Sequence, residues 1–90
     1  MMPTGIPIDR KDTLRSLRVK LGLTQKQAAK LLGVGESTLR SWEKDSSNIS
    51  YSNIKKIEEV YGVDSQYIFF GKESTFSELV RNNTKTKSTA

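Results

Sequence analysis

The segment 25–44 constrains this chain more than any other, because it contains two short amphipathic patterns separated by a glycine. It reads QKQAAKLLGVGESTLRSWEK. Ala29 and Gly33 lie four and eight residues after its first residue, and Leu39 and Trp42 lie six and nine residues after the glycine. These intervals favour two helices that meet at a sharp turn, with the small Ala29 where the helices approach closely.

Local chemistry predicts where both helices begin and end. Thr24 and Gln27 form a capping box, so the first helix is expected to begin at Gln25. Gly33 suits the left-handed conformation that ends a helix, and the second helix is expected to begin at Glu36. This arrangement is a helix-turn-helix, in which the first helix braces the second and the second can enter the DNA major groove.

The second helix has two different faces. An advance of about 100° per residue places Leu39 and Trp42 on one face, which we expect to be buried. The opposite face is polar, and it contains Ser37, Arg40, Ser41 and Lys44, with Glu36 at its edge. Any small helical domain can show this periodicity with a merely solvated polar face. The capping box, small alanine, turn glycine and Trp-Glu pair at fixed offsets together favour DNA binding instead.

Composition restricts the function further. Ninety residues with 34% apolar content suffice for one compact domain, and a net charge of +5 favours a polyanionic partner. The chain has no histidine and no cysteine, which removes the usual general bases, thiol nucleophiles and zinc ligands. We therefore expect no enzyme activity, no metal and no cofactor. No signal peptide or membrane-spanning segment is visible, so we expect a soluble cytoplasmic protein, bacterial or phage-encoded and associated with the nucleoid.

The remaining patterns complete an all-α domain. Asp9 is expected to cap a helix that runs to Leu21. After the helix-turn-helix and a polar connector, a further helix is expected to end at Tyr61, and a short one to cover residues 65–70. The prediction is a compact five-helix domain over residues 9–71.

The two ends of the chain differ from this domain. Residues 1–8 contain two prolines and are expected to form a flexible arm. Thr75 and Glu78 form a second capping box, which predicts a short sixth helix over about 75–82. The rest of residues 72–90 is expected to be a disordered basic tail. The apolar side chains of the sixth helix are Phe76, Leu79 and Val80.

From Thr13 to Gly71 the chain resembles the Cro/CI-type, or XRE-family, helix-turn-helix proteins typified by lambdoid phage repressors. The resemblance rests on LRSLRVKLGLTQKQAAKLLGVGESTLRSWEKD and, further on, IKKIEEVYGVDSQYIFFG. It implies a lambda-repressor-like domain that binds double-stranded DNA.

The resemblance also implies roles for individual residues. Arg40 can pair bidentately with guanine, and Glu36 can accept a hydrogen bond from cytosine. Arg18 and Glu43 occupy positions that form a structural ion pair. The residues expected to contact base edges are Glu36, Ser37, Arg40 and Ser41. Those expected at backbone phosphates are Gln25, Lys26, Lys44, Ser52 and Asn53, with Lys30 as a further candidate.

The function expected from these observations is transcriptional regulation, most simply repression by a homodimer on a near-palindromic operator. The residues expected at the dimer interface are Tyr67, Phe70, Phe76, Leu79 and Val80. An alternative is an antitoxin-type interaction protein, whose segment 72–90 binds a partner protein while the same helix-turn-helix autoregulates.

Overall fold

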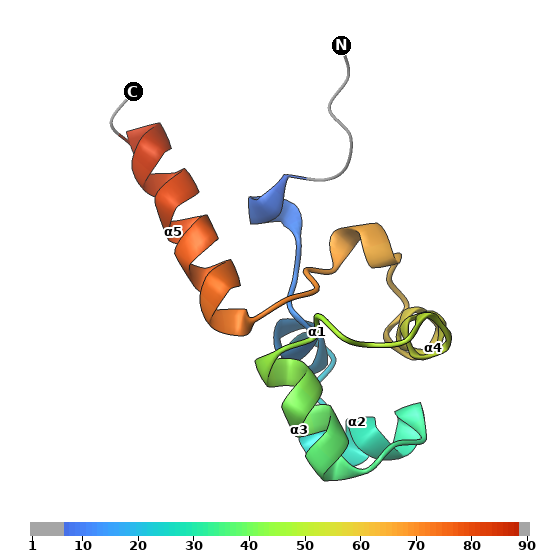
Figure 1. Cartoon of the computed structure of the whole chain (residues 1–90). Coiled ribbons are helices and arrows are strands. Elements are labelled where there is room, and N and C mark those ends of the chain that lie inside the picture. The colour runs from blue at the N-terminus through green and yellow to red at the C-terminus, as the bar shows by residue number, and fades with distance from the viewer. Residues whose placement is uncertain (1–6, 89–90) are drawn as a thin grey trace.

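The computed structural model describes residues 7–88, and the described part is helical, with no strand (Figure 1). Its elements are η1 (Ile8–Arg10), α1 (Leu14–Lys20), α2 (Gln25–Leu32), α3 (Glu36–Lys44), α4 (Tyr51–Tyr61), η2 (Ser65–Tyr67) and α5 (Glu73–Ser88), where η denotes a 3-10 helix. The predicted all-α class is confirmed. None of the described helices is long and apolar enough to cross a membrane.

The predicted helix-turn-helix is present. The Thr24 hydroxyl accepts a hydrogen bond from the Gln27 amide at 3.1 Å, and the Gln27 side chain accepts one from the Thr24 amide at 2.9 Å. Gly33 ends α2 with a φ of 72°, in the left-handed region that glycine adopts without strain. Gly35 then precedes α3 without a side-chain cap. Local capping and turn chemistry therefore define the unit.

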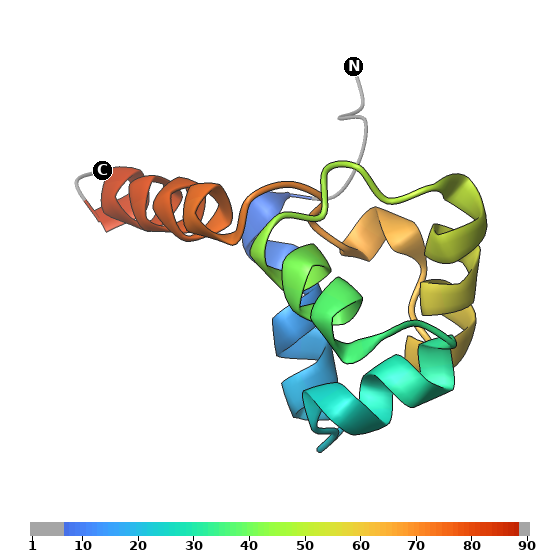
Figure 2. The same ribbon diagram turned by 60° about the horizontal axis from the view of Figure 1, so that its bottom comes forward.

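Helices α1 to α4 surround one small core (Figure 2). Ala28 and Ala29 are buried on α2, and their small side chains allow close packing against the neighbouring helices. Trp42 is half-buried against the core, on the apolar side of α3 as expected. The buried apolar residues are Leu14, Leu17, Ala28, Ala29, Leu32, Leu39, Ile57, Tyr61 and Ile68.

The prediction of a first helix capped by Asp9 is wrong, because α1 begins at Leu14. The Thr13 hydroxyl caps α1 by accepting from the Ser16 amide at 3.1 Å. The residue before it, Asp12, is extended and forms a parallel bridge with Ile68. Leu21 follows the end of α1 and is half-exposed rather than buried.

The same bridge shortens the predicted helix over 65–70. Asp64 caps the 3-10 helix η2 as expected, with its carboxylate accepting from the Gln66 amide at 3.0 Å. Helical structure stops at Tyr67, because the Tyr67 carbonyl accepts from the Asp12 amide at 2.8 Å. Ile68 is then extended and buried.

The predicted sixth helix is present but longer at both ends than 75–82. Helix α5 projects from the body of the domain, so its far end lies away from the other helices (Figures 1 and 2). Residues 83–88, expected in the disordered tail, are helical here, because each added residue of a formed helix gains a backbone hydrogen bond without needing apolar contacts. Residues 1–6 of the predicted arm and 89–90 of the tail lie outside the described residues, and Ile8 already begins η1.

Candidate nucleic-acid interface

Helix α3 exposes the polar face that the sequence pattern predicted. Leu39 is fully buried beneath it, and Trp42 packs against the core beside it. The packed apolar side fixes the orientation of the helix, and the opposite side is left to solvent (Figure 2). The exposed residues of this face are Glu36, Ser37, Arg40, Ser41 and Lys44. The four residues expected at base edges therefore lie on one accessible face.

Two of these residues form an ion pair with each other. Arg40 Nη2 lies 3.1 Å from Glu36 Oε2, one helical turn away. Their side chains are 61% and 44% exposed, so water solvates both charges. Such a pair contributes little to stability and opens easily. Both groups are available to other hydrogen-bond partners.

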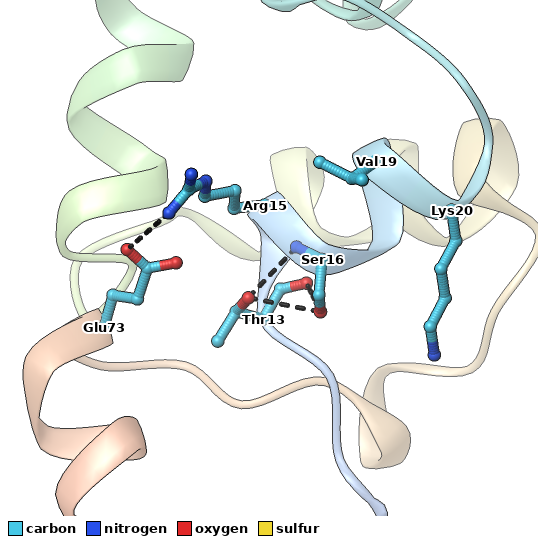
Figure 3. A pocket seen from close by; sticks show the side chains of 6 residues that line it. All are labelled: Thr13, Arg15, Ser16, Val19, Lys20 and Glu73. Carbon is cyan, nitrogen blue, oxygen red and sulfur yellow. Dashed lines mark hydrogen bonds and ion pairs between the residues drawn. The ribbon is translucent and has the colours of Figure 1, made fainter.

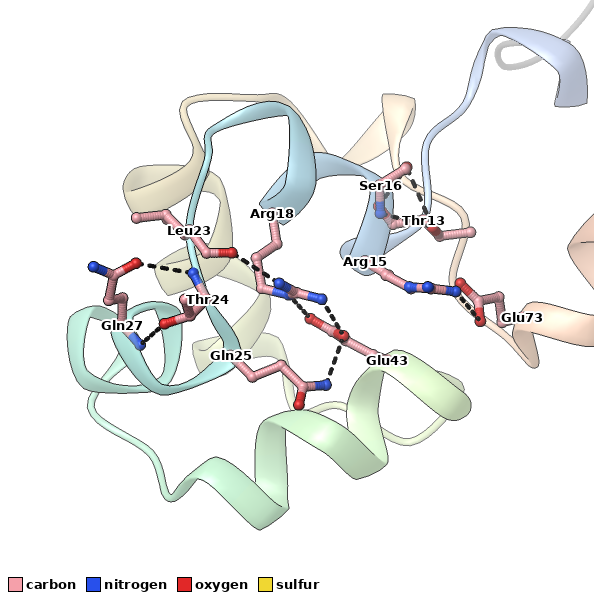
Figure 4. Close-up of polar contacts among 10 residues, drawn as sticks. All are labelled: Thr13, Arg15, Ser16, Arg18, Leu23, Thr24, Gln25, Gln27, Glu43 and Glu73. Carbon is pink, nitrogen blue, oxygen red and sulfur yellow. Dashed lines mark hydrogen bonds and ion pairs between the residues drawn. The ribbon is translucent and has the colours of Figure 1, made fainter.

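The ion pair predicted between Arg18 and Glu43 is also present, and it is buried (Figure 4). Arg18 Nε lies 2.6 Å from Glu43 Oε2, and Arg18 Nη2 lies 3.2 Å from Oε1. The guanidinium also donates to the Leu23 carbonyl at 2.8 Å. Hydrogen bonds donated to the Glu43 carboxylate raise the pKa of Arg18, although partial burial of the guanidinium acts in the opposite direction. This network joins α1, the start of the helix-turn-helix and α3.

Gln25 belongs to the same network in the structure. Its side-chain amide donates to Glu43 Oε1 at 3.1 Å (Figure 4). The side chain therefore bridges the start of α2 to α3. Its expected phosphate contact is not tested by this geometry and remains a prediction.

The other phosphate candidates lie on three different helices. Lys44 lines a shallow depression beside α3, together with Arg15, Gln25, Arg40 and Glu73 and the buried pair beneath them. Ser52 and Asn53 lie outside this depression, on the first turn of α4. The exposed side chains Lys26 and Lys30 lie on α2.

Ser46 is a structural residue that the sequence reasoning missed. Its side chain is buried in the polar connector, where its hydroxyl accepts from the Gly71 amide at 2.9 Å. The Ser46 amide donates to the Gly71 carbonyl, also at 2.9 Å. The adjacent residues Asp45 and Lys72 form an antiparallel bridge. These contacts attach the end of α3 to the start of α5, and no sequence spacing indicated them.

The residues expected at a dimer interface differ in how much surface they leave free. Tyr67 and Leu79 are 41% and 42% exposed. Phe76 is half-buried, because its ring lies 5.0 Å from that of Phe69. Phe70 packs against the core, and Val80 is half-buried on α5. Part of this apolar surface therefore serves the fold of the monomer itself.

Among the described residues, no three or more aspartate, glutamate, histidine or cysteine side chains are grouped so that they could hold a metal ion. The lining of the depression beside α3 is instead mainly cationic, which suits an anionic partner.

Residues 14–68 match the helix-turn-helix family, from the start of α1 to Ile68, the residue that follows η2. The chain belongs to this family. Its recognition as a Cro/CI-type helix-turn-helix protein is thereby confirmed. The chain is 33% identical over 60 residues to the HTH-type transcriptional regulator ImmR of Bacillus subtilis. It is 28% identical over 69 residues to the cryptic phage CTXphi transcriptional repressor RstR of Vibrio cholerae.

These matches cover 67% and 77% of this chain but only 46% and 62% of the two relatives. The chain thus spans about half to three fifths of the relatives' lengths. The similarity therefore covers only a part of either relative.

Proposed function

We propose that this chain is a sequence-specific, double-stranded DNA-binding regulator of transcription that acts as a repressor on a near-palindromic operator. The observation that carries the proposal is the exposed polar face of α3, held in one orientation by buried Leu39 on its other side. The similar proteins described as a transcriptional regulator and a transcriptional repressor support it. Occupancy of a promoter is sufficient for repression.

The base contacts follow from the chemistry of the exposed face. Arg40 donates to O6 and N7 of a guanine, and Glu36 accepts from N4 of a cytosine. Their ion pair of 3.1 Å lies on this exposed face, so both groups are close together and accessible before DNA binds. Ser37 and Ser41 donate to or accept from the adjacent bases.

Backbone contacts position this face in the groove. Lys26 and Lys44 supply exposed cations on α2 and α3, and Gln25 supplies the helix-end amide of α2. Ser52 and Asn53 supply polar groups on the first turn of α4, which lies beyond the connector. Two separate phosphate-contacting regions fix the register of the domain on the duplex.

A homodimer on DNA would use the projecting helix α5. Its exposed Leu79, together with Phe76 and Val80, provides an apolar strip, and Tyr67 and Phe70 lie on the adjoining segment of the domain. A lone domain contacts only a few base pairs, whereas two copies recognise half-sites about one helical turn apart.

In vitro selection of duplexes from a random pool tests the proposal directly. We expect a consensus made of two inverted half-sites whose centres lie about one helical turn apart. Recovery of no consensus would contradict sequence-specific binding, and a single unpaired half-site would contradict the dimer.

Leu79→Glu then tests the dimer interface, with Ser77→Glu as the matched control on the same helix. Leu79→Glu is expected to leave half-site binding nearly unchanged and to abolish cooperative binding to the full operator. Deletion of residues 72–90 is expected to have the same effect. Full cooperativity in both variants would remove α5 from the interface.

The antitoxin alternative makes a different use of the same strip on α5. It predicts a second small protein that co-purifies with the intact chain and is lost with Leu79→Glu. Cooperative operator binding by the purified chain alone favours the dimer.

A further inference from the structure

We propose that Arg15 contacts a DNA backbone phosphate and that Glu73, at the start of α5, competes with this phosphate for the guanidinium. The inference rests on the proposed DNA binding and adds a contact and its regulation to it. Arg15 and Glu73 both line the depression beside α3, where Arg40 and Lys44 also lie. Arg15 therefore opens toward the same side of the molecule as the recognition helix.

The charges of this depression favour an anion. Its lining carries four cationic side chains and two carboxylates, which is a net charge of +2. The Arg18 cation is already bonded to the Glu43 carboxylate beneath the surface. Arg40 is paired with Glu36, a carboxylate outside the lining, at 3.1 Å, and counting Glu36 leaves a net charge of +1. The remaining cations are the exposed side chains Lys44 and Arg15, and Arg15 is 62% exposed.

The contact between Arg15 and Glu73 is loose. Arg15 Nη1 lies 3.9 Å from Glu73 Oε1, which is beyond hydrogen-bond distance. The guanidinium is thus attracted electrostatically to the carboxylate at this distance. Its planar N–H donors match the geometry of a phosphate. A phosphate that binds Arg15 would lie close to the Glu73 carboxylate. The repulsion between these two negative charges opposes binding.

The position of Glu73 is set by the attachment of α5 to the domain. Ser46 and Gly71 exchange two hydrogen bonds of 2.9 Å, and Lys72 pairs with Asp45 directly before the helix. The carboxylate on the first turn of α5 is therefore held beside α1. A partner protein or a second copy that moves α5 would also move the Glu73 carboxylate relative to Arg15, and so change how strongly a phosphate binds there.

Arg15 and Glu73 also border a second depression, whose other lining residues are Thr13, Ser16, Val19 and Lys20 (Figure 3). Its polar groups are already bonded within the domain: the Thr13 hydroxyl caps α1, and Lys20 lies 2.9 Å from Asp12. The side that contains Arg40 and Lys44 is the one equipped for a phosphate.

The first test is the salt dependence of binding to a labelled duplex of random sequence, followed by fluorescence anisotropy. Arg15→Gln is expected to weaken binding several-fold at low salt and to reduce the slope of log K against log salt by about 0.9 per monomer. Lys20→Gln is the matched control, because Lys20 is an equally exposed cation of α1 that also pairs with a carboxylate. An Arg15→Gln variant that binds like the control overturns the proposal.

The second test concerns the sign of the Glu73 effect. Glu73→Gln is expected to tighten binding several-fold at low salt, with a gain that shrinks as salt increases. Glu78→Gln removes the same charge from α5 outside the depression and is expected to change binding less. In the double variant Arg15→Gln with Glu73→Gln, the gain from Glu73→Gln is expected to disappear. If Glu73→Gln weakens binding, the pair only docks α5, and competition for a phosphate is excluded.

These outcomes separate the inference from the proposed function. If Arg40→Ala weakens binding while Arg15→Gln matches Lys20→Gln, the DNA-binding function stands and the Arg15 contact falls. If the unaltered chain binds neither random nor selected duplexes at low salt, both fall.

Discussion

Helix α3 takes part in two arginine-glutamate pairs that have the same chemistry and opposite surroundings. The pair of Arg18 and Glu43 is closed at 2.6 Å, with side chains 12% and 5% exposed. The pair of Arg40 and Glu36 is 3.1 Å long, with side chains 61% and 44% exposed. Burial makes the first pair part of the fold, whereas exposure leaves the second free to exchange partners.

The difference follows from the cost of removing charge from water. A buried guanidinium or carboxylate that loses its partner keeps its desolvation penalty, so the pair is costly to break. A solvated pair that opens regains water at both ends, so breaking it costs little. Residues on one short helix can therefore have a structural role on one side and a recognition role on the other.

The largest effect is expected from Glu43→Ala, which leaves the Arg18 cation buried without its carboxylate. We expect a loss of about 3–5 kcal/mol in the free energy of unfolding, measured by chemical denaturation. DNA binding would then be lost through unfolding. Glu36→Ala is the matched control, with an expected change within about 0.5 kcal/mol. A Glu43→Ala variant that stays folded and changes only its base preference would contradict the structural role of the pair between Arg18 and Glu43.

Arg40→Ala tests the exposed side of the comparison. We expect it to cost about 1–3 kcal/mol of binding free energy on the selected operator and much less on random DNA, because the bidentate guanine contact is sequence-specific. Its melting temperature should match that of the unaltered chain. Equal losses on both duplexes would assign Arg40 to a phosphate instead.

The pH dependence of stability probes the surroundings of the buried pair, because Tyr61 lies close to Arg18 and Glu43. Burial raises the pKa of its phenol from 10.0 to about 12, and the charge of Glu43 acts in the same direction. The unfolded chain therefore loses this proton first, and the contribution of Tyr61 to stability is complete below pH 10 and declines as pH rises toward 12. The expected decline is at most about 3 kcal/mol, since each pKa unit corresponds to about 1.4 kcal/mol.

Tyr61→Phe isolates this contribution from the titration of the lysines and of the other tyrosines. The Tyr61 hydroxyl is buried without a hydrogen-bond partner among the described residues, so the variant should fold at neutral pH with equal or greater stability. Between pH 10 and 12 it should lose less stability than the unaltered chain in parallel denaturation curves. Identical curves would show that the tyrosine is solvated.

The smallest effect is expected from Lys44→Ala, which removes one exposed cation at the end of α3. The slope of log K against log salt should decrease in magnitude by about one per monomer, with the sequence preference retained. Anisotropy titrations at several salt concentrations on operator and random duplexes measure both quantities. An unchanged slope would place Lys44 outside the interface.

The helix-turn-helix was predictable from the sequence because its determinants are local. Thr24 and Gln27 are three residues apart, and Gly33 ends α2 through its own backbone conformation. The buried side of α3 follows from the positions of Leu39 and Trp42 within one helix. Interactions over three or four residues leave a spacing that can be recognised without knowledge of the fold.

The resemblance, rather than spacing alone, indicated the pair between Arg18 and Glu43. These residues are 25 positions apart, and nothing local requires that they meet. The participation of Gln25 in the same network was not predicted, since its side chain could equally have faced solvent.

The tertiary structure alone decided how the ends of the domain are held. Asp12 pairs with Ile68, which ends η2 early and delays the start of α1, and Ser46 bonds to Gly71, which attaches α5 to the end of α3. Apart from the Ser46 hydroxyl, these contacts use backbone amides and carbonyls, which carry no side-chain pattern that a sequence could show. The sequence by itself determined the recognition unit, because helix caps and turns are local. The placement of α5 and Glu73 beside that unit depended on backbone pairing between distant segments.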